Sequence, residues 1–199
     1  MNASETRQHF ARTYTDTLSR VLSMLPFADL GRVLEILERA YTQRLQVFIA
    51  GNGGSAATAS HMANDLIKGI ALPEGHGIRA ISLSDNVPLM TAIGNDISYT
   101  EIFSYPLAQQ ANASDVLIVI SASGNSPNIL RAIETAKVKR MTTIGFLGMG
   151  GGKAAGMVDV PVVVPANDYG PVEDAHMIFD HLVMSYLKDF ISNKQRSSL

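Results

Sequence analysis

The sequence predicts an α/β protein in which a mostly parallel, five-stranded sheet lies between helices in three layers, after two N-terminal helices. Short segments rich in β-branched residues alternate along the chain with segments of helical periodicity. This alternation is typical of a parallel sheet covered on both faces. Two of the strand-like segments run directly into turns rich in glycine and serine that open helices. Of the 199 residues, 46% are hydrophobic and 17% charged, which is a globular composition.

Two amphipathic helices precede the first strand. Apolar residues recur at helical spacing over residues 5–24, and Pro26 then interrupts the pattern. A second helical pattern covers residues 29–41, with charges opposite its apolar face. These helices could cover one flank of the sheet or pair with another subunit, so residues 1–44 are a candidate oligomer interface.

The strands and the remaining helices follow in regular order. We expect strands at residues 45–50, 78–83, 115–120, 142–147 and 160–164. We expect helices from the first glycine-rich turn through residue 66, over residues 126–139 with Pro127 in the first turn, and over residues 172–190. Residues 148–152 are interpreted as a flexible glycine cluster. The chain is interpreted as a single domain over residues 1–192, followed by a loose tail at residues 193–199.

Composition excludes several classes of function. The net charge is -2 and no run of Lys or Arg stands out, which argues against a nucleic-acid partner. The absence of cysteine excludes disulfides and thiolate metal sites. Residues 1–20 carry charges and lack the apolar segment of a signal peptide, and no apolar run reaches the length of a membrane span. We therefore expect a cytoplasmic protein that does not contact a membrane.

Two polar turns are the strongest candidates for ligand binding. The first is Gly51-Asn52-Gly53-Gly54-Ser55, and the second is Ser121-Ala122-Ser123-Gly124-Asn125-Ser126. Each lies between a strand and a helix, where backbone N–H groups, hydroxyls and the helix N-terminus favour an anion. Neither turn has the pattern of a P-loop or of a dinucleotide-binding turn, so no nucleotide cofactor is expected. One such turn is more often an ordinary connection, but two in one domain favour phosphate binding.

Two helices carry side chains suited to acid–base chemistry or to metal binding. His61 and Asp65 are four residues apart, which places them on one face of the helix after the first turn. Glu173 and His181 are two turns apart on the last helix, close enough in angle to face one cavity. Imidazoles and carboxylates at such spacings can hold a divalent metal or transfer protons.

Simpler interpretations of these residues stay open at this point. His61 and Asp65 could be a local hydrogen-bonded pair, and Asp180 a surface charge or a partner of a site residue. His176 could be a core histidine or a site residue. Asn95-Asp96 has the pattern of a helix cap followed by a turn.

Several ordered segments resemble the SIS-domain phosphoheptose isomerases, and the resemblance spans nearly the whole chain. The segments are Gly51-Asn52-Gly53-Gly54-Ser55 with His61, Thr91-Ala92-Ile93-Gly94-Asn95-Asp96, Asp115-Val116-Leu117-Ile118, Ser121-Ala122-Ser123-Gly124-Asn125-Ser126-Pro127-Asn128, Gly151-Gly152-Lys153 and the helix bearing Glu173 and His181. The resemblance implies an SIS fold and an aldose–ketose isomerase. Its expected reaction converts sedoheptulose 7-phosphate to a D-glycero-heptose 7-phosphate through an enediol, in a homotetramer.

The resemblance also implies roles for individual residues. The expected substrate-binding residues are Asn52, Gly53, Gly54, Ser55, Asn95, Asp96, Ser121, Ala122, Ser123, Ser126 and Glu173. In the family a glutamate at the position of Asp65 is the base, and a histidine at the position of His181 is its acid partner. Some members hold zinc, and the corresponding residues here are His61, Asp65, Glu173 and His181. All of these groups are expected to share one cavity with the second polar turn, the serine-rich turn (residues 121–126).

The chain departs from the family pattern at three positions. Asp65 replaces a glutamate, Glu173 replaces a glutamine, and Ala122 replaces a threonine. The base is therefore Asp65 or Glu173, with His181 as acid, and the second carboxylate favours a divalent metal. Two alternatives belong to other classes: a non-catalytic SIS protein that binds the replication initiator DnaA, and a module that senses sugar phosphates.

Overall fold

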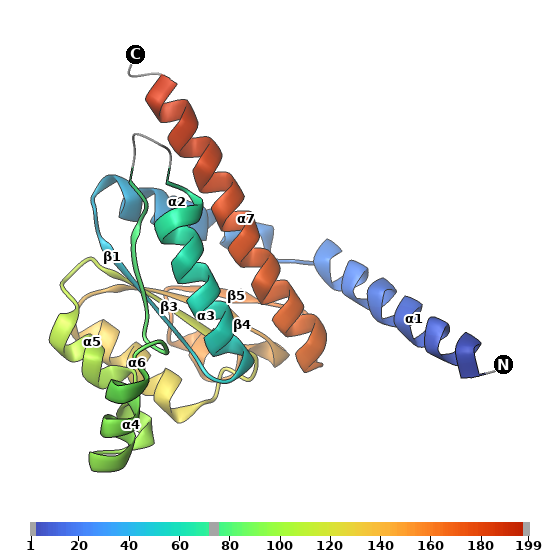
Figure 1. The fold of residues 1–199 in the computed structure, drawn as a ribbon, viewed down its shortest axis with the longest axis horizontal. Helices are drawn as coiled ribbons and strands as arrows, with labels where there is room; N and C mark the ends of the chain where they lie inside the picture. The colour runs from blue at the N-terminus through green and yellow to red at the C-terminus, as the bar shows by residue number, and fades with distance from the viewer. Residues whose placement is uncertain (1–2, 72–75, 197–199) are drawn as a thin grey trace.

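A parallel sheet forms the centre of the computed structural model, which describes residues 3–71 and 76–196. Its five strands are β1 (Gln46–Gly51), β2 (Arg79–Ser82), β3 (Val116–Ser121), β4 (Thr142–Leu147) and β5 (Val160–Val163). They lie in the order β2-β1-β3-β4-β5, and every neighbouring pair is parallel. Figure 1 shows the sheet with helices on either side.

The helices connect these strands. The α-helices are α1 (Ala3–Ser23), α2 (Phe27–Thr42), α3 (Gly54–Asn64), α4 (Val87–Asp96), α5 (Ser104–Gln110), α6 (Pro127–Val138) and α7 (Tyr169–Arg196). Helix α3 continues into one turn of π-helix, η1 (Asp65–Gly69). Short 3-10 turns are η2 (Tyr99–Glu101), η3 (Met149–Gly151) and η4 (Ala154–Gly156).

Alternating side chains along each strand build two separate cores, and these define the three layers. Val47 and Ile49 of β1 pack with α2, α3 and α7, whereas Phe48 and Ala50 pack with α5, α6 and the end of α4. Because successive side chains point to opposite faces, a strand buried on both sides must be apolar throughout. The six residues of β3 are all buried, which fits its central place in the sheet.

The strand order determines where a ligand can bind. Strand β1 is followed in the chain by β2 on one side, and the chain then crosses to β3 on the other side. Loops after β1 and β3 therefore diverge, and the crevice between them at the carboxyl ends is the usual ligand site of open α/β sheets. The two polar turns singled out in the sequence lie at this crevice.

The structure confirms the predicted fold class and corrects two local expectations. Helix α7 continues through Arg196, so residues 193–196 are helical rather than a loose tail, and residues 197–199 lie outside the described part. The glycine cluster at residues 148–152 is packed instead of flexible. Its Gly148 N–H donates to the Ala122 carbonyl at 3.1 Å, and Gly151 is buried.

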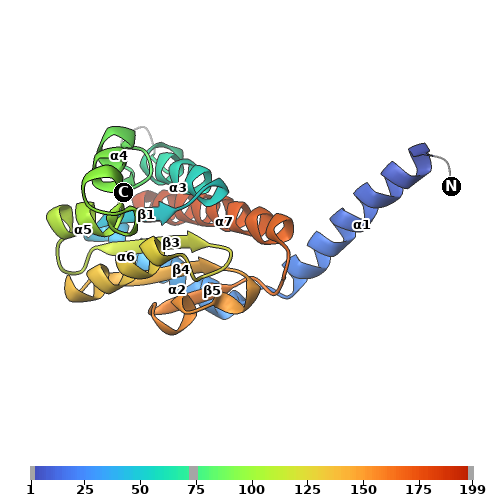
Figure 2. The same ribbon diagram turned by 90° about the horizontal axis from the view of Figure 1, so that it is seen from below.

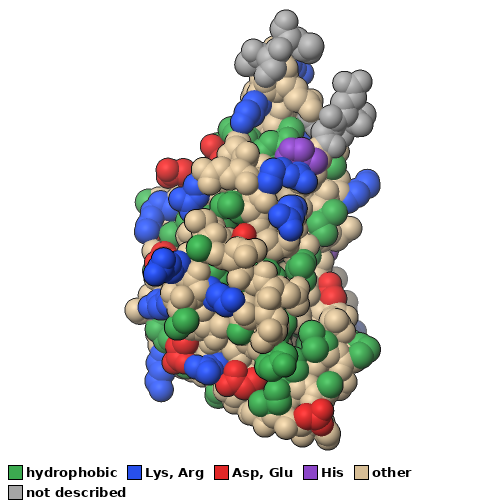
Figure 3. All heavy atoms as spheres, turned by 90° about the vertical axis from the view of Figure 1, so that its left-hand side faces the viewer, with side chains coloured by type: hydrophobic (Ala, Val, Ile, Leu, Met, Phe, Trp, Pro, Cys, Tyr) green, Lys and Arg blue, Asp and Glu red, His purple; other side chains and the backbone are tan. Residues whose placement is uncertain are grey.

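Two features of the surface concern partners. Within the described residues, no helix has both the length and the apolar character needed to cross a membrane. Hydrophobic side chains gather at the lower end of the face in Figure 3, near α4. Exposed apolar residues of α4 and the segment after it include Val87, Ile97 and Tyr99.

Candidate active site

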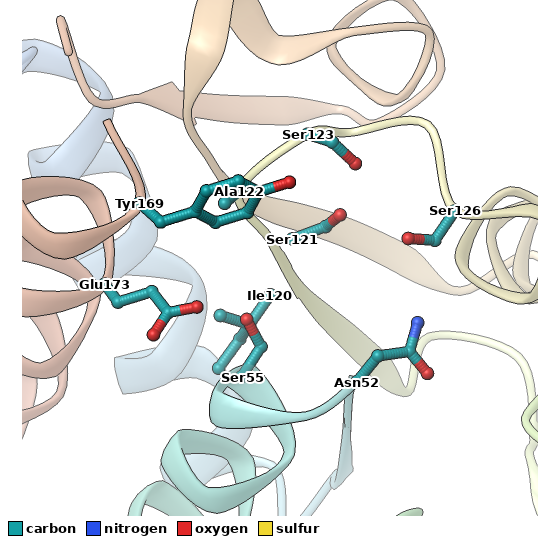
Figure 4. A pocket seen from close by; sticks show the side chains of 9 residues that line it. All are labelled: Asn52, Ser55, Ile120, Ser121, Ala122, Ser123, Ser126, Tyr169 and Glu173. Atoms are coloured by element: carbon teal, nitrogen blue, oxygen red, sulfur yellow. The ribbon is translucent and has the colours of Figure 1, made fainter. Parts of the chain in front are cut away.

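A polar cavity of about 140 Å³ opens between the ends of β1 and β3. Figure 4 shows hydroxyls, an amide and a carboxylate turned toward its centre. It is lined by Asn52, Ser55, Ile120, Ser121, Ala122, Ser123, Ser126, Tyr169 and Glu173. The N-termini of α3 and α6 begin at its wall. Their partial positive charge and the hydroxyls make the cavity suited to a phosphate group.

The serine-rich turn after β3 is held in one conformation by its own side chains. The Gly124 N–H donates to Ser121 Oγ at 3.2 Å, and the Asn125 N–H donates to Ser123 Oγ at 3.3 Å. Ser126 precedes α6, and its side chain makes no capping hydrogen bond. A hydroxyl that accepts a backbone N–H keeps its own hydrogen for donation. Three hydroxyls can therefore donate to a bound anion.

The opposite wall of the cavity is held by a pair of amides. Asn52 Nδ2 donates to Asn128 Oδ1 at 2.9 Å, and Asn128 Nδ2 donates back to Asn52 Oδ1 at 2.8 Å. Asn128 is buried, and its Oδ1 also accepts the Ile129 N–H. Tyr99 Oη donates to Asn52 Oδ1 at 3.3 Å. These bonds fix the first turn relative to the serine-rich turn.

Glu173 brings a carboxylate to the start of α3. A Cβ atom built on Gly54 would lie 2.7 Å from Glu173 Oε2, so the carboxylate lies directly against the backbone of this helix N-terminus. The absence of a side chain at residue 54 permits this approach, and the helix dipole favours the negative charge there. Glu173 thus belongs to the same cavity as the serine-rich turn.

A second cluster of titratable side chains lies between α3 and α7. His61 Nε2 is 3.6 Å from Asp65 Oδ2, 3.8 Å from Asp180 Oδ2 and 3.4 Å from His181 Nε2. One ligand atom from each of the four residues lies within 4.8 Å of the others. The two carboxylates are buried, and the two imidazoles are exposed at the mouth.

Asp180 is the most unusual member of this cluster. Its side chain is 0% exposed, and neither carboxylate oxygen has a hydrogen-bond partner. Burial raises the pKa of Asp180 to about 6, and the charge of Asp65 adds to the rise while His61 and His181 oppose it. A buried polar group without partners is costly. This orphaned carboxylate, beside two imidazoles and a second carboxylate, fits a divalent cation.

The structure separates some residues that were expected to lie together. The residues lining the cavity at the serine-rich turn do not include His61, Asp65 or His181, so one site shared by all of these groups stays a prediction. Glu173 faces that cavity and His181 faces His61, so these two do not face one space. Neither Asn95 nor Asp96 lines the cavity. They end α4, where Asn95 Nδ2 donates to Asp96 Oδ1 at 2.7 Å.

Sequence reasoning also missed or undervalued several residues. Tyr169 lines the cavity and was not a candidate. Asp180 is fully buried, so its interpretation as a surface charge is wrong. A signal was available, because residue 180 lies at helical spacing from the buried positions 176, 183 and 187. An acid on the buried stripe of a helix points to a special environment.

The fold and the cavity define a class of protein, and comparison with known proteins agrees. The parallel sheet and the serine-lined cavity at the carboxyl ends of its strands are the features expected of an SIS domain. The model of the SIS domain family matches residues 9–148 of this chain. The chain therefore belongs to the SIS-domain proteins.

Within that class the chain belongs to the phosphoheptose isomerase family. It is 37% identical to the phosphoheptose isomerase of Burkholderia pseudomallei over 168 residues, 84% of this chain and 85% of the relative. It is 41% identical to that of Clostridium acetobutylicum over 151 residues, 76% of each chain. The solved phosphoheptose isomerase of Neisseria gonorrhoeae superposes with a TM-score of 0.81 at 28% identity, covering 94% of this chain and 98% of the other.

Proposed function

We propose that this chain is a phosphoheptose isomerase that converts sedoheptulose 7-phosphate to a D-glycero-heptose 7-phosphate through an enediol. The observation that carries the proposal is identity of 37% to 41% with phosphoheptose isomerases over at least three quarters of both chains. The cavity at the ends of β1 and β3 supports it, because it offers donors suited to a phosphate.

The phosphate is assigned to the serine-rich turn. Hydroxyls of Ser121, Ser123 and Ser126 line the cavity together with Asn52 and Ser55. Hydrogen bonds to a charged phosphate oxygen are stronger than those between neutral groups. Binding energy from the phosphate, far from the reacting carbons, can orient the sugar for proton transfer.

The sugar chain would extend along α3 and α7 toward the histidines. Both helices begin at the cavity, and their parallel course brings His61 beside His181. At 1.5 Å per residue, His61 lies about 9 Å beyond Ser55 along α3. An open-chain heptose phosphate is long enough to reach from one group to the other.

Isomerisation requires a base for the carbon-bound proton and a proton donor for the oxygens. Asp65 or Glu173 is the base in this proposal, and His181 is the acid. Asp65 is supported by its place beside His61 and His181 in the cluster. Glu173 is supported by its place in the cavity.

A divalent cation, zinc in this proposal, is the alternative to proton donation by His181, and it would be held by the His61, Asp65 and His181 side chains. When bound, it would polarise the sugar carbonyl and stabilise negative charge on the enediolate oxygens. We also propose that the protein is cytoplasmic and forms a homotetramer. The resemblance and the largely exposed helix α1 support the tetramer.

The test of the function is an assay of purified protein with sedoheptulose 7-phosphate, monitored by the appearance of the aldose. Asp65→Asn should lower kcat by about 10²–10⁴-fold while the fold is retained, because general bases contribute on that scale. Glu173→Gln is the matched variant, since it removes the other candidate carboxylate. Retained turnover in Asp65→Asn and a comparable loss in Glu173→Gln would move the base to Glu173. Binding of the sugar phosphate without conversion by the wild type would contradict the function.

A further inference from the structure

Asp180 poses a question that the isomerase mechanism alone does not answer. Its side chain is fully buried on α7, one residue before His181, and both oxygens lack hydrogen-bond partners. A buried carboxylate without hydrogen bonds is destabilising, and its one ion-pair contact, with His61, is long at 3.8 Å, so a further group is expected to pair with it.

The geometry around Asp180 indicates which group that is. Ligand bonds of about 2.1 Å in a tetrahedral arrangement separate ligand atoms by roughly 3.4 Å. From His61 Nε2, the nearest atoms of His181, Asp65 and Asp180 lie at 3.4, 3.6 and 3.8 Å. These three spacings are close to those between ligands of one ion, and all four ligand atoms lie within 4.8 Å of one another.

The charges of the cluster lead to the same conclusion. Two carboxylates lie on the buried side, and the Nε2 atoms of His61 and His181 face each other. When both rings carry their hydrogen on Nδ1, the two Nε2 lone pairs face each other, and a divalent cation would join them while neutralising both carboxylates. Two imidazolium ions at this distance would repel each other.

Glu173 does not share this space. Its carboxylate lies against Gly54 and lines the cavity with the serine-rich turn. It lies eight residues before His181 on α7, about 12 Å along the helix axis. The second carboxylate of the cluster therefore belongs to Asp180, the residue before His181.

We propose that Asp180 is a direct metal ligand, and that it forms with His61, Asp65 and His181 a two-histidine, two-carboxylate site for one divalent cation between α3 and α7. Glu173 is left to contact the substrate. The role of this cation in catalysis rests on the proposed isomerase function, but its binding does not.

Zinc affinity tests the proposal without reference to turnover. Metal-free full-length protein is titrated with Zn²⁺ in the presence of a chromophoric chelator that competes for the ion. Asp180→Asn, which keeps the shape and removes the charge, should weaken zinc binding by about 100-fold or more. Glu173→Gln is the matched control and should change zinc affinity by less than about threefold, since its carboxylate lies outside the cluster.

Thermal unfolding separates a metal ligand from a merely structural residue. Asp180→Leu removes the buried charge, so its metal-free form should melt at or above the temperature of the metal-free wild type. Added zinc should raise the melting temperature of the wild type and of Glu173→Gln, and should have little effect on either Asp180 variant.

Several results would overturn the assignment of Asp180 as a metal ligand: no zinc uptake by the wild type, wild-type zinc affinity in both Asp180 variants, or a loss of affinity confined to Glu173→Gln.

The sedoheptulose 7-phosphate assay of the zinc-loaded wild type tests the isomerase function separately. No conversion together with the expected zinc data would refute the isomerase function and leave Asp180 as a ligand. Conversion together with unchanged zinc affinity in the Asp180 variants would refute Asp180 as a metal ligand and support the isomerase function.

Discussion

His176 is a neutral imidazole enclosed in the core beneath α7. It is 1% exposed and stacks on Phe146, with ring centroids 6.5 Å apart, and lies beside Phe179. Burial lowers the pKa of His176 to about 4, and the backbone of Leu147 opposes this in part. An unfolded histidine has a pKa near 6.5. Between these values the unfolded chain binds a proton that the folded chain does not, so stability falls as the pH falls.

Replacing His176 with Phe should remove this dependence on pH. The wild type is expected to lose roughly 3 kcal/mol of unfolding free energy through His176 as the pH falls from about 6.5 to 4, and to keep it in full above that range. His176→Phe fills the same aromatic site without a titrating group. Urea unfolding of both proteins at several pH values checks this. Parallel stability curves for the two proteins would show that His176 is not the titrating group.

The sequence allowed part of the site to be predicted, and the limit lies in tertiary contacts. Ser121, Ser123 and Ser126 were predictable as ligand-cavity residues because a polar turn between a strand and a helix of a parallel sheet has only one place to lie. Asp180 was not predictable as a site residue. Helical spacing shows which face of α7 carries Asp180, but it does not show which elements pack against that face. His61 and Asp65 were placed on one face correctly, whereas their contact with Asp180 depended on how α3 and α7 pack.

At the scale of elements, the strands were predictable to within about one or two residues, since buried β-branched runs have few alternatives in an α/β chain. The helices α4 and α5 were not expected from the sequence, and two further features were not predictable. The π-helical turn at Asp65–Gly69 has no sequence signature of its own, although such turns often occur at functional sites. The packed glycine loop at residues 148–152 resembles a flexible segment in sequence, because its order comes from contacts with the serine-rich turn.

The contact between these two loops gives a prediction about Gly124. Its φ is +60°, and a Cβ atom there would lie 2.0 Å from the Gly151 carbonyl oxygen. Gly124→Ala should therefore destabilise the protein by at least about 2 kcal/mol and raise KM, because the left-handed conformation and the clash both displace the serine-rich turn. Urea unfolding and steady-state kinetics measure the two effects.

Gly31→Ala is the matched control for this substitution. Gly31 is exposed within α2, and nothing lies within 4 Å of a Cβ atom built there. The change should stabilise the protein by up to about 1 kcal/mol, because alanine favours a helix interior over glycine. Equal effects of the two alanines would contradict the packing described for Gly124.

At the scale of the whole molecule, α1 extends away from the body of the chain, as Figures 1 and 2 both show. Its only buried residue is Val21, and Phe10 near its free end is 73% exposed. Tyr14 Oη donates to Asp174 Oδ2 at 2.6 Å, which ties the helix to the start of α7. Helices of this length depend mainly on packing for their stability in water, so α1 requires a partner surface.

Phe10→Lys should weaken the proposed tetramer, because a charge would replace an apolar side chain that the assembly is expected to bury. Sedimentation velocity over a range of concentrations should show dissociation to smaller species at concentrations where the wild type is a tetramer. Val138→Lys is the control, since Val138 is 84% exposed at the end of α6, where a positive charge suits the helix dipole. A monomeric wild type would contradict the tetramer. An unchanged tetramer in Phe10→Lys would exclude this part of α1 from the interface and leave its stability to the contacts with α7.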